Sequence, residues 1–373
     1  MEFINLKSQQ NKIRGSIEDK IKGVLDHGQF IMGPEVFELE AILAKQVGVK
    51  HCISCSSGTD ALLILLLANN IGVGDAVLTT PFTYIATSEA ITMSGATPVF
   101  VDINKDTFNI DPFKIESAIA IAKEKNLKPK AIMPVDLFGL PARYRIISEI
   151  SNKYNLLIIE DGAQGFGGSI KGKKACSFGD ASATSFFPAK PLGCYGDGGA
   201  IFTNNDEIAN NACSIRSHGQ GLDKYHNVRI GLNGRLDTIQ AAILLEKFKL
   251  FSNEVKLRKI IAQSYKAKIS SEYIKQYIPY GYQSVWAQFS LLIPNGYNRI
   301  ELIKKLKKKG IPSAIYYPIP LHLQRVNKEL NYKEGDFPIA EEISKKIISI
   351  PMHPYLKKID QDTVVNALNK IIG

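Results

Sequence analysis

The sequence predicts an α/β fold, with a mostly parallel sheet in a large domain and a smaller α+β domain after it. Short apolar runs alternate with helix-length segments through the first 200 residues, which is the pattern of a parallel sheet covered by helices. Polar residues gather where the predicted strands end, as they do at the ligand sites of such sheets. We expect the large domain to cover residues 1–250 and the small domain residues 251–373.

The predicted strands of the large domain are apolar runs of five or six residues: 51–55, 75–80, 97–102, 131–136 and 156–161. Helices are expected from Gly58 and over about Thr83 to Ser94. A long helical pattern from Arg235 to about Lys268 leads out of the large domain. In the small domain we expect a strand over 285–293, a helix from about Arg299 to Lys309, and a last helix over roughly Pro338 to Ile348.

Charge and composition narrow the class of protein. The 46 Lys and Arg residues exceed the 36 Asp and Glu residues, giving a net charge of +10. The lysines are dispersed, and the densest run, 304–309, reads as the solvated face of a helix. No nucleic-acid-binding motif accompanies them, so we expect no nucleic-acid partner. A small anionic substrate would also be drawn by this charge.

The chain is expected in the cytoplasm, away from membranes. No apolar run reaches the roughly 20 residues that span a bilayer, and the first residues do not resemble a signal peptide. The odd number of cysteines, five, favours reduced thiols. Cys52 and Cys55 form a CxxC without a second pair at zinc spacing, so we expect no metal site and interpret them as small apolar fillers.

Lys190 is the strongest candidate for chemistry. It lies in SFFPAKPLGCYGDGGA, residues 185–200, between an apolar strand and a glycine-rich turn. Phe186, Phe187 and Leu192 crowd it with apolar surface, which disfavours the ammonium form and lowers the pKa of the lysine. A neutral amine is a nucleophile that can form a Schiff base with an aldehyde cofactor. The alternative is a surface lysine on a loop.

Residues at the predicted strand ends could hold such a cofactor. Gly58 and Thr59 follow Ser57 at the start of a helix, where free N–H groups favour a phosphate, although an ordinary N-cap fits as well. Asp161, with Gln164 after it, could pair with a protonated pyridine nitrogen or could be a turn aspartate. Tyr84 could stack on a ring or belong to the core.

Two further segments offer substrate contacts. Asn233 and Arg235 precede the long helix, and an arginine fork suits a carboxylate or a phosphate; a solvent-exposed arginine is the alternative. Tyr316, Tyr317 and His322 lie in IYYPIPLH, where prolines and aromatics suggest a rigid pocket wall. A packed loop with a structural histidine fits the same pattern.

Taken together, these segments resemble the pyridoxal-phosphate-dependent nucleotide-sugar aminotransferases of the DegT/DnrJ type. The resemblance runs over nearly the whole chain, through SSGTDALL, PFTYIATSEAI, IIEDGAQGFG, SFFPAKPLGCYGDGGA, RSHGQG, NGRLDTIQAAIL and IYYPIPLH. Any one segment alone is modest evidence. Their order and spacing together make the match strong. It implies the fold of aspartate aminotransferase (fold type I) and pyridoxal 5'-phosphate as cofactor.

The resemblance also implies roles for individual residues. Lys190 matches the Schiff-base lysine, Asp161 the partner of the pyridine nitrogen, and Gln164 the residue beside the ring hydroxyl. The phosphate contacts match Gly58, Thr59 and Ser185, and the stacking aromatic matches Tyr84. Asn233 matches an asparagine that reaches the phosphate from the other protomer, which implies a homodimer with shared sites. Many members have histidine where Asp136 stands, and no catalytic role is assigned to that position.

Within the family, the likeness is greatest to enzymes that aminate C3 of a UDP-linked 2-acetamido-2-deoxy-hexuluronic acid, with glutamate as donor, for surface polysaccharide such as O-antigen. MGPEV, FFPAKPLGCYGDGG and NGRLDTIQAAIL suggest it. Arg235 is the candidate for clamping the uronic carboxylate, with Tyr316, Tyr317 and His322 opposite. The alternative reaction is 4-amination of a UDP- or dTDP-linked 4-keto-6-deoxy sugar. An alternative of another class is a non-catalytic sensor or interaction protein on the same fold.

Overall fold

A seven-stranded sheet forms the centre of the protein, whose computed structural model describes residues 1–223 and 225–372. The strand order is β1-β9-β8-β5-β4-β2-β3, and every neighbouring pair is parallel except the two that β9 makes with β1 and β8. The strands are β1 (His51–Cys55), β2 (Asp75–Thr79), β3 (Thr97–Phe100), β4 (Lys128–Met133), β5 (Leu157–Asp161), β8 (Ala181–Ser185) and β9 (Gly199–Thr203). The predicted mostly parallel sheet is confirmed.

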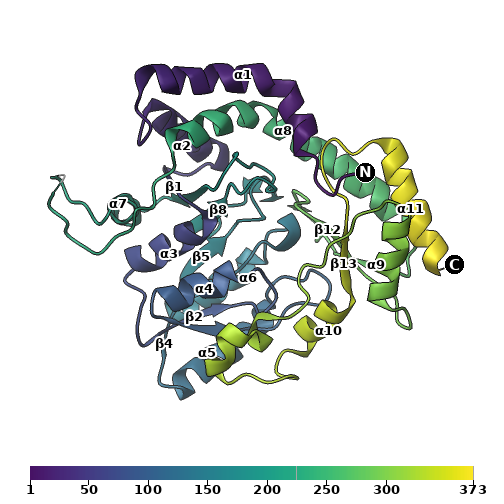
Figure 1. Ribbon diagram of the computed structural model, residues 1–373. Helices are drawn as coiled ribbons and strands as arrows, with labels where there is room; N and C mark the ends of the chain where they lie inside the picture. The colour runs from purple at the N-terminus through teal and green to yellow at the C-terminus, as the bar shows by residue number, and fades with distance from the viewer. Residues whose placement is uncertain (224, 373) are drawn as a thin grey trace.

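Helices cover both faces of this sheet because its buried strands send alternate side chains to opposite sides. Val77 packs into the cluster of α3, α4 and α7, whereas the next residue, Leu78, packs into the cluster of α5 and α6. The helices are α1 (Leu6–His27), α2 (Pro34–Val47), α3 (Gly58–Ala68), α4 (Ala86–Met93), α5 (Ile115–Glu124), α6 (Tyr144–Tyr154), α7 (Asp206–Ile215) and α8 (Thr238–Lys268). The first helix, α1, runs beside α8 along one side of the molecule (Figure 1).

A second core lies at the C-terminal side, around a three-stranded sheet in the order β10-β12-β13. It includes Ile261 and Tyr265 from the last turns of α8, whereas Phe251 of the same helix packs with the large sheet. The predicted domain boundary after residue 250 therefore lies inside a helix that serves both cores. The elements are β10 (Ile274–Lys275), β12 (Phe289–Leu292), α9 (Arg299–Lys308), α10 (Pro338–Lys346), β13 (Ile347–Ile350) and α11 (Lys358–Ile372).

Two predictions for this region were wrong in detail, and one helix was missed. The strand expected over 285–293 covers only β12, because Trp286 has a φ of 55°, which breaks extended geometry. The helix expected to reach Ile348 ends at Lys346, because the apolar residues 347–350 pair with β12 as strand β13. The sequence analysis did not predict α11.

The C-terminal segment returns to the large sheet and closes one side of it. Asp102, which follows β3, accepts hydrogen bonds from the backbone N–H groups of Ile339 (3.2 Å) and Ala340 (3.0 Å) at the start of α10. The same carboxylate pairs with Lys114 at 3.0 Å. Earlier in this segment, the N–H of Leu321 donates to Pro81 O at 2.7 Å, just after β2.

Short elements complete the chain. A small sheet joins β11 to the large domain in the order β11-β6-β7. The short elements are β6 (Ser169–Ile170), β7 (Lys173–Lys174), β11 (Tyr282–Gln283) and the 3-10 helices η1 (Pro112–Lys114), η2 (Leu137–Gly139), η3 (Leu321–Leu323) and η4 (Arg325–Leu330). Among the described residues, none of the helices is both long enough and apolar enough to cross a bilayer.

Candidate active site

A cavity of about 470 Å³ lies at the carboxyl ends of the central strands. Parallel strands end at one edge of the sheet, so the residues that follow β1, β2, β5 and β8 converge there even though they are far apart in sequence. Of the predicted site residues, the cavity is lined by Gly58, Thr59, Tyr84, Asp161, Gln164, Ser185, Lys190, Tyr316 and Tyr317.

One end of the cavity has the geometry of a phosphate site. Ser57 caps α3, its hydroxyl accepting from the N–H of Asp60 at 3.0 Å, and the N–H groups at the helix start face the cavity lining. Gly58 lies so close to Ser185 that a Cβ there would be 2.7 Å from the Ser185 Cβ. The helix start and the end of β8 therefore form one wall, with room only for glycine between them.

Asp161 presents a buried carboxylate at the opposite part of the cavity. It is 4% exposed, and its Oδ2 accepts from the hydroxyl of Thr87 at 2.8 Å while Oδ1 accepts from the N–H of Ala163 at 3.2 Å. Burial raises the pKa of Asp161, whereas these two donors and the charge of Lys190 lower it. The carboxylate is thus held by donors that favour its charged form in a dry setting.

Gln164 is fixed at both ends of its amide. Its Oε1 accepts from the N–H of Phe138 at 2.8 Å, and its Nε2 donates to the hydroxyl of Tyr317 at 3.2 Å. Tyr317 packs edge-on against Phe82, and its ring centroid lies 6.3 Å from that of Tyr84. Burial raises the pKa of Tyr317, so its hydroxyl stays protonated at neutral pH. Tyr84 is 58% exposed and presents its ring to the cavity.

Lys190 lies on the turn after β8, opposite Asp161. Backbone bonds shape this turn: the N–H of Lys190 donates to Phe187 O at 2.9 Å, and that of Cys194 donates to Phe186 O at 2.7 Å. Burial lowers the pKa of Lys190, and Asp161 partly opposes that shift. The predicted direction of the pKa shift is confirmed. Nothing in the described part of the chain hydrogen-bonds to Nζ, which leaves the amine available to a ligand.

Asn233 and Arg235 lie outside this cavity. They precede α8, and an Arg235 guanidinium N–H donates to the side-chain oxygen of Asn233. The Arg235 Nε is buried and has no hydrogen-bond partner. Neither residue lines the cavity of its own chain, and the roles predicted for them assume a second subunit.

The structure does not support His322 as a substrate contact. The ring is 2% exposed, packs against Phe337 with centroids 4.7 Å apart, and its Nε2 lies 3.0 Å from Glu341. Burial lowers the pKa of His322, although Glu341 opposes that shift. The prediction placed His322 in the wall with Tyr316 and Tyr317, but the η3 turn directs it into the core beside α10.

Some lining residues were not predicted. Thr87 bonds Asp161 from one turn beyond Tyr84, and its place in PFTYIATSE was the only available signal. Ile4 reaches the cavity from the N-terminal segment, and Gln288 from the residue before β12. The Gln288 Oε1 is buried without a partner. Sequence gave no indication of these contacts because the partners are distant along the chain.

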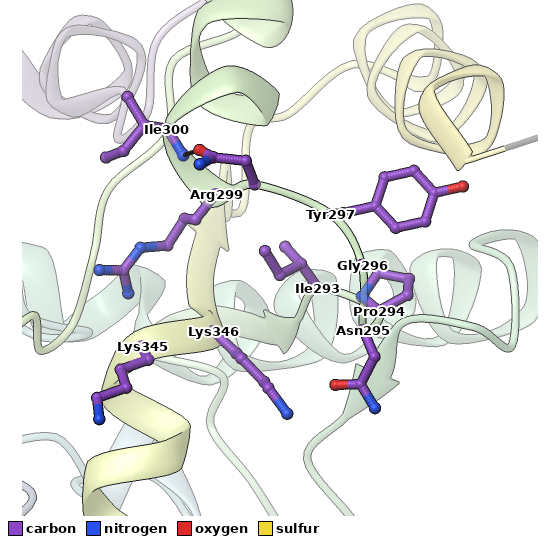
Figure 2. Close-up of a pocket in the computed structure, with 10 residues that line it drawn as sticks. Ile293, Pro294, Asn295, Gly296, Tyr297, Arg299, Ile300, Lys345 and Lys346 are labelled. Carbon is purple, nitrogen blue, oxygen red and sulfur yellow. Dashed lines mark hydrogen bonds between the residues drawn. The ribbon is translucent and has the colours of Figure 1, made fainter.

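Figure 2 shows a separate cavity of about 330 Å³ where β12 leads into α9. Its basic side chains already have partners: Lys345 pairs with Glu334 at 3.0 Å, Lys346 pairs with Glu342 at 2.5 Å, and Arg299 donates to Ser344 O. Over residues 1–223 and 225–372, no group of three or more His, Cys, Asp or Glu side chains is arranged to hold a metal.

The main cavity fits pyridoxal phosphate. A helix start and Ser185 can hold a phosphate, and the buried Asp161 can pair with a pyridine nitrogen. Gln164 can hydrogen-bond a ring hydroxyl through its amide. The amine of Lys190, with its lowered pKa, suits an aldehyde carbon.

Two sequence comparisons relate the chain to known proteins. The profile of the DegT/DnrJ/EryC1/StrS aminotransferase family matches residues 11–369. A UDP-2-acetamido-2-deoxy-3-oxo-D-glucuronate aminotransferase of Pseudomonas aeruginosa is 46% identical over 357 residues, which cover 95% of this chain and 96% of that protein.

Solved structures agree with these sequence matches. The crystal structure of a DegT DnrJ EryC1 StrS aminotransferase from Brucella abortus superposes with a TM-score of 0.96 at 45% identity, covering 100% of both chains. NtdA from Bacillus subtilis, with bound cofactor PMP, superposes with a TM-score of 0.91 at 30% identity, covering 100% of this chain and 85% of that one.

Proposed function

The chain belongs to the DegT/DnrJ/EryC1/StrS aminotransferase family, and we propose that it transfers the amino group of glutamate to the 3-keto group of a UDP-linked 2-acetamido-2-deoxy-hexuluronic acid. It is an enzyme, a pyridoxal-phosphate-dependent sugar aminotransferase of fold type I, and the non-catalytic alternative is set aside. The observation that carries the substrate proposal is the 46% identity, over nearly the whole of both chains, to an aminotransferase of that 3-oxo-glucuronate sugar.

The residues of the cavity have separable tasks in this reaction. Pyridoxal phosphate, when bound, supplies an aldehyde carbon and a pyridine ring that withdraws electrons from the reacting carbon. Asp161, whose charged form accepts hydrogen bonds from Thr87 and Ala163, would hold the proton on the pyridine nitrogen of the bound cofactor. With the cofactor bound, the amine of Lys190 would act as general base and acid and move the proton at the donor α-carbon.

The substrate proposal is tested in the reverse direction. Purified protein is given 2-oxoglutarate and a panel of amino sugars that includes UDP-linked 3-amino-uronic acid and UDP- and dTDP-linked 4-amino-6-deoxy sugars. Release of glutamate with the 3-amino-uronic acid supports the proposal. Turnover of the 4-amino sugars alone would sink it and leave the aminotransferase assignment intact.

The charges of the site support a homodimer with shared active sites. Lys190 is the one basic side chain lining the described cavity, whereas Asp161 and Asp197 add negative charge. The proposed substrate brings a diphosphate and a carboxylate, which need further cations. Arg229 and Arg235 lie on the segment between α7 and α8, which also carries the exposed Leu222 and Ile230. We propose that this segment reaches the partner's cavity.

Mixed dimers test this arrangement. Lys190→Ala and Asn233→Ala proteins, each inactive alone, should regain part of the wild-type activity after mixing, because a mixed dimer rebuilds one intact site. No recovery after verified subunit exchange, or an active monomer in sedimentation, would contradict shared sites. Lys190→Ala mixed with itself is the matched control.

We further propose that Arg235 clamps the uronic carboxylate across this interface and that the enzyme works in the cytoplasm for surface polysaccharide such as O-antigen. The unpartnered Arg235 Nε and the five free cysteines are consistent with these points. A charge-assisted bond contributes on the order of 1.5–3 kcal/mol. Arg235→Ala should therefore lower kcat/KM for the uronic sugar by roughly tenfold to a hundredfold and leave a 6-deoxy sugar unaffected.

A further inference from the structure

Two acidic side chains lie in contact beneath the turn that carries Asp161 and Gln164, and the mechanism above uses neither. Asp136 follows β4, and Glu160 is the residue before Asp161 in β5; both are 0% exposed. Because neighbours on a strand point to opposite faces, Glu160 faces away from the cavity that Asp161 lines. The backbones are paired too, since the N–H of Asp136 donates to Asp161 O at 3.0 Å.

Glu160 has hydrogen-bond donors at both carboxyl oxygens, whereas Asp136 has them at only one. Both oxygens of Glu160 accept from backbone N–H groups, those of Cys176 at 2.5 Å and Phe178 at 2.9 Å. For Asp136, Oδ1 accepts from the N–H of Ala142 at 3.0 Å and from the hydroxyl of Tyr144 at 2.8 Å. Its Oδ2 is buried and has no donor. An ionised Asp136 would leave that oxygen unsatisfied, whereas a protonated Oδ2 can donate to Glu160.

The charged groups around the pair favour one retained proton. Asp161, Cys176 and Tyr144 face it without offering a positive charge, and Tyr282 lies at its edge. Lys173, whose side chain is exposed, lowers the pKa of Glu160, and Arg143 and Arg145 lie near Tyr282 at the edge of the pair. Burial raises the pKa of both Asp136 and Glu160. The charge of Glu160 raises the pKa of Asp136 further, whereas a hydrogen bond from Asp136 lowers the pKa of Glu160, so the shared proton belongs on Asp136.

No space separates the carboxyl pair from the turn formed by residues 161–165. A Cβ added at Gly165 would lie 2.4 Å from Asp136 Oδ2, so the turn packs directly on this carboxyl. Residues 136–139 hold Gln164 as well, through the N–H of Phe138. The turn that carries Asp161 and Gln164 therefore touches Asp136 directly, and a shift of Asp136 would move both residues.

We propose that Asp136 is a positioning residue that shares one proton with Glu160, and that this bond holds the 161–165 turn in the geometry that binds the cofactor. The shared proton also limits the pair to one negative charge beside Asp161. Loss of that proton at high pH would place unpaired charge in a buried layer and displace the turn.

The test compares Asp136→Asn with Asp136→Leu. The asparagine amide can donate to Glu160 at every pH and can still accept from Ala142 and Tyr144, whereas leucine can do neither. Because the folded pair binds a proton more tightly than the unfolded chain, its stabilising effect is present at low pH and is lost as the pH rises. The dissociation constant of pyridoxal phosphate for the wild type should rise about tenfold or more from pH 7 to pH 9.5.

For Asp136→Asn we expect a dissociation constant within about threefold of wild type at pH 7 and without the extra alkaline rise. Asp136→Leu should bind about tenfold or more weakly throughout. Tyr144→Phe is the matched control, since it removes one donor to Oδ1 and should lower thermal stability without flattening the pH profile. These readouts concern binding and are independent of the sugar substrate.

Infrared difference spectroscopy of the apoenzyme gives a direct readout. The wild type at pH 7 should show the carbonyl band of a buried protonated carboxylic acid, and Asp136→Asn should lack it. Absence of that band in wild type would overturn the proposal, as would an Asp136→Asn protein that binds the cofactor tenfold more weakly at pH 7 while keeping the wild-type alkaline rise.

Discussion

Thr87→Val should weaken the binding of pyridoxal phosphate by removing a single hydroxyl. Valine has nearly the shape of threonine, and Thr87 is 1% exposed, so the change leaves packing largely intact. What is lost is the bond from the Thr87 hydroxyl to Asp161 Oδ2 at 2.8 Å. The bond favours the charged carboxylate, which is the form that pairs with a protonated pyridine nitrogen.

The magnitude follows from that bond. A hydrogen bond to a buried charged group contributes about 1.5–3 kcal/mol. If the charged form of Asp161 is the one that binds, the dissociation constant of pyridoxal phosphate should rise roughly tenfold to a hundredfold. The pKa of Asp161 should rise further, because the second largest influence on it is the lowering by Thr87. In a titration toward acid, Thr87→Val should therefore lose the cofactor at a higher pH than the wild type does.

The assay is titration of apoenzyme with pyridoxal phosphate, followed by its visible absorbance between pH 5 and pH 8. Thr83→Val is the matched control, since Thr83 is also buried and lies 3.3 Å from the Thr87 hydroxyl without contacting Asp161. Its effect should be clearly smaller. Equal affinity and an unshifted acid limb in Thr87→Val would refute the idea that this hydroxyl keeps Asp161 charged.

Three other outcomes can be checked with standard assays. Lys190→Ala should fold but lose transamination by roughly 10²–10⁴-fold, measured as 2-oxoglutarate release from glutamate, and retention of wild-type turnover would exclude its role. His322→Leu should leave KM for the sugar within about twofold but lower the melting temperature, because it removes the 3.0 Å contact between His322 Nε2 and Glu341. A large rise in KM would return His322 to the substrate wall. Burial lowers the pKa of His353 to about 4, so its neutral form stabilises the fold above about pH 6.5, and this contribution is lost as the pH falls toward 4. The free energies of unfolding of wild type and His353→Asn, measured across this pH range, should converge at low pH. A constant difference between them would contradict the assignment.

Much of the active site could be predicted because parallel strands impose it. The runs ending at Cys55, Asp161 and Ser185 form strands of one sheet that point in the same direction, so the residues that follow them must meet at one edge. The crowding of Lys190 by apolar neighbours is a local property, so the direction of its pKa shift was also available from sequence. The conformation of the IYYPIPLH segment was not, because its path depends on Asp102 anchoring α10, more than 200 residues away.

The sequence by itself therefore determined the alternation of strands and helices, the edge at which ligands bind, and the residues with the right chemistry there. Only the tertiary structure decided which side chains enter the cavity and which serve the core, as with His322 and Thr87. It also decided that 347–350 is a strand and that Asp136 lies against Glu160. The reason is physical: strand periodicity and local crowding act between neighbours in the chain, whereas hydrogen-bond partners and burial are set by packing between distant segments.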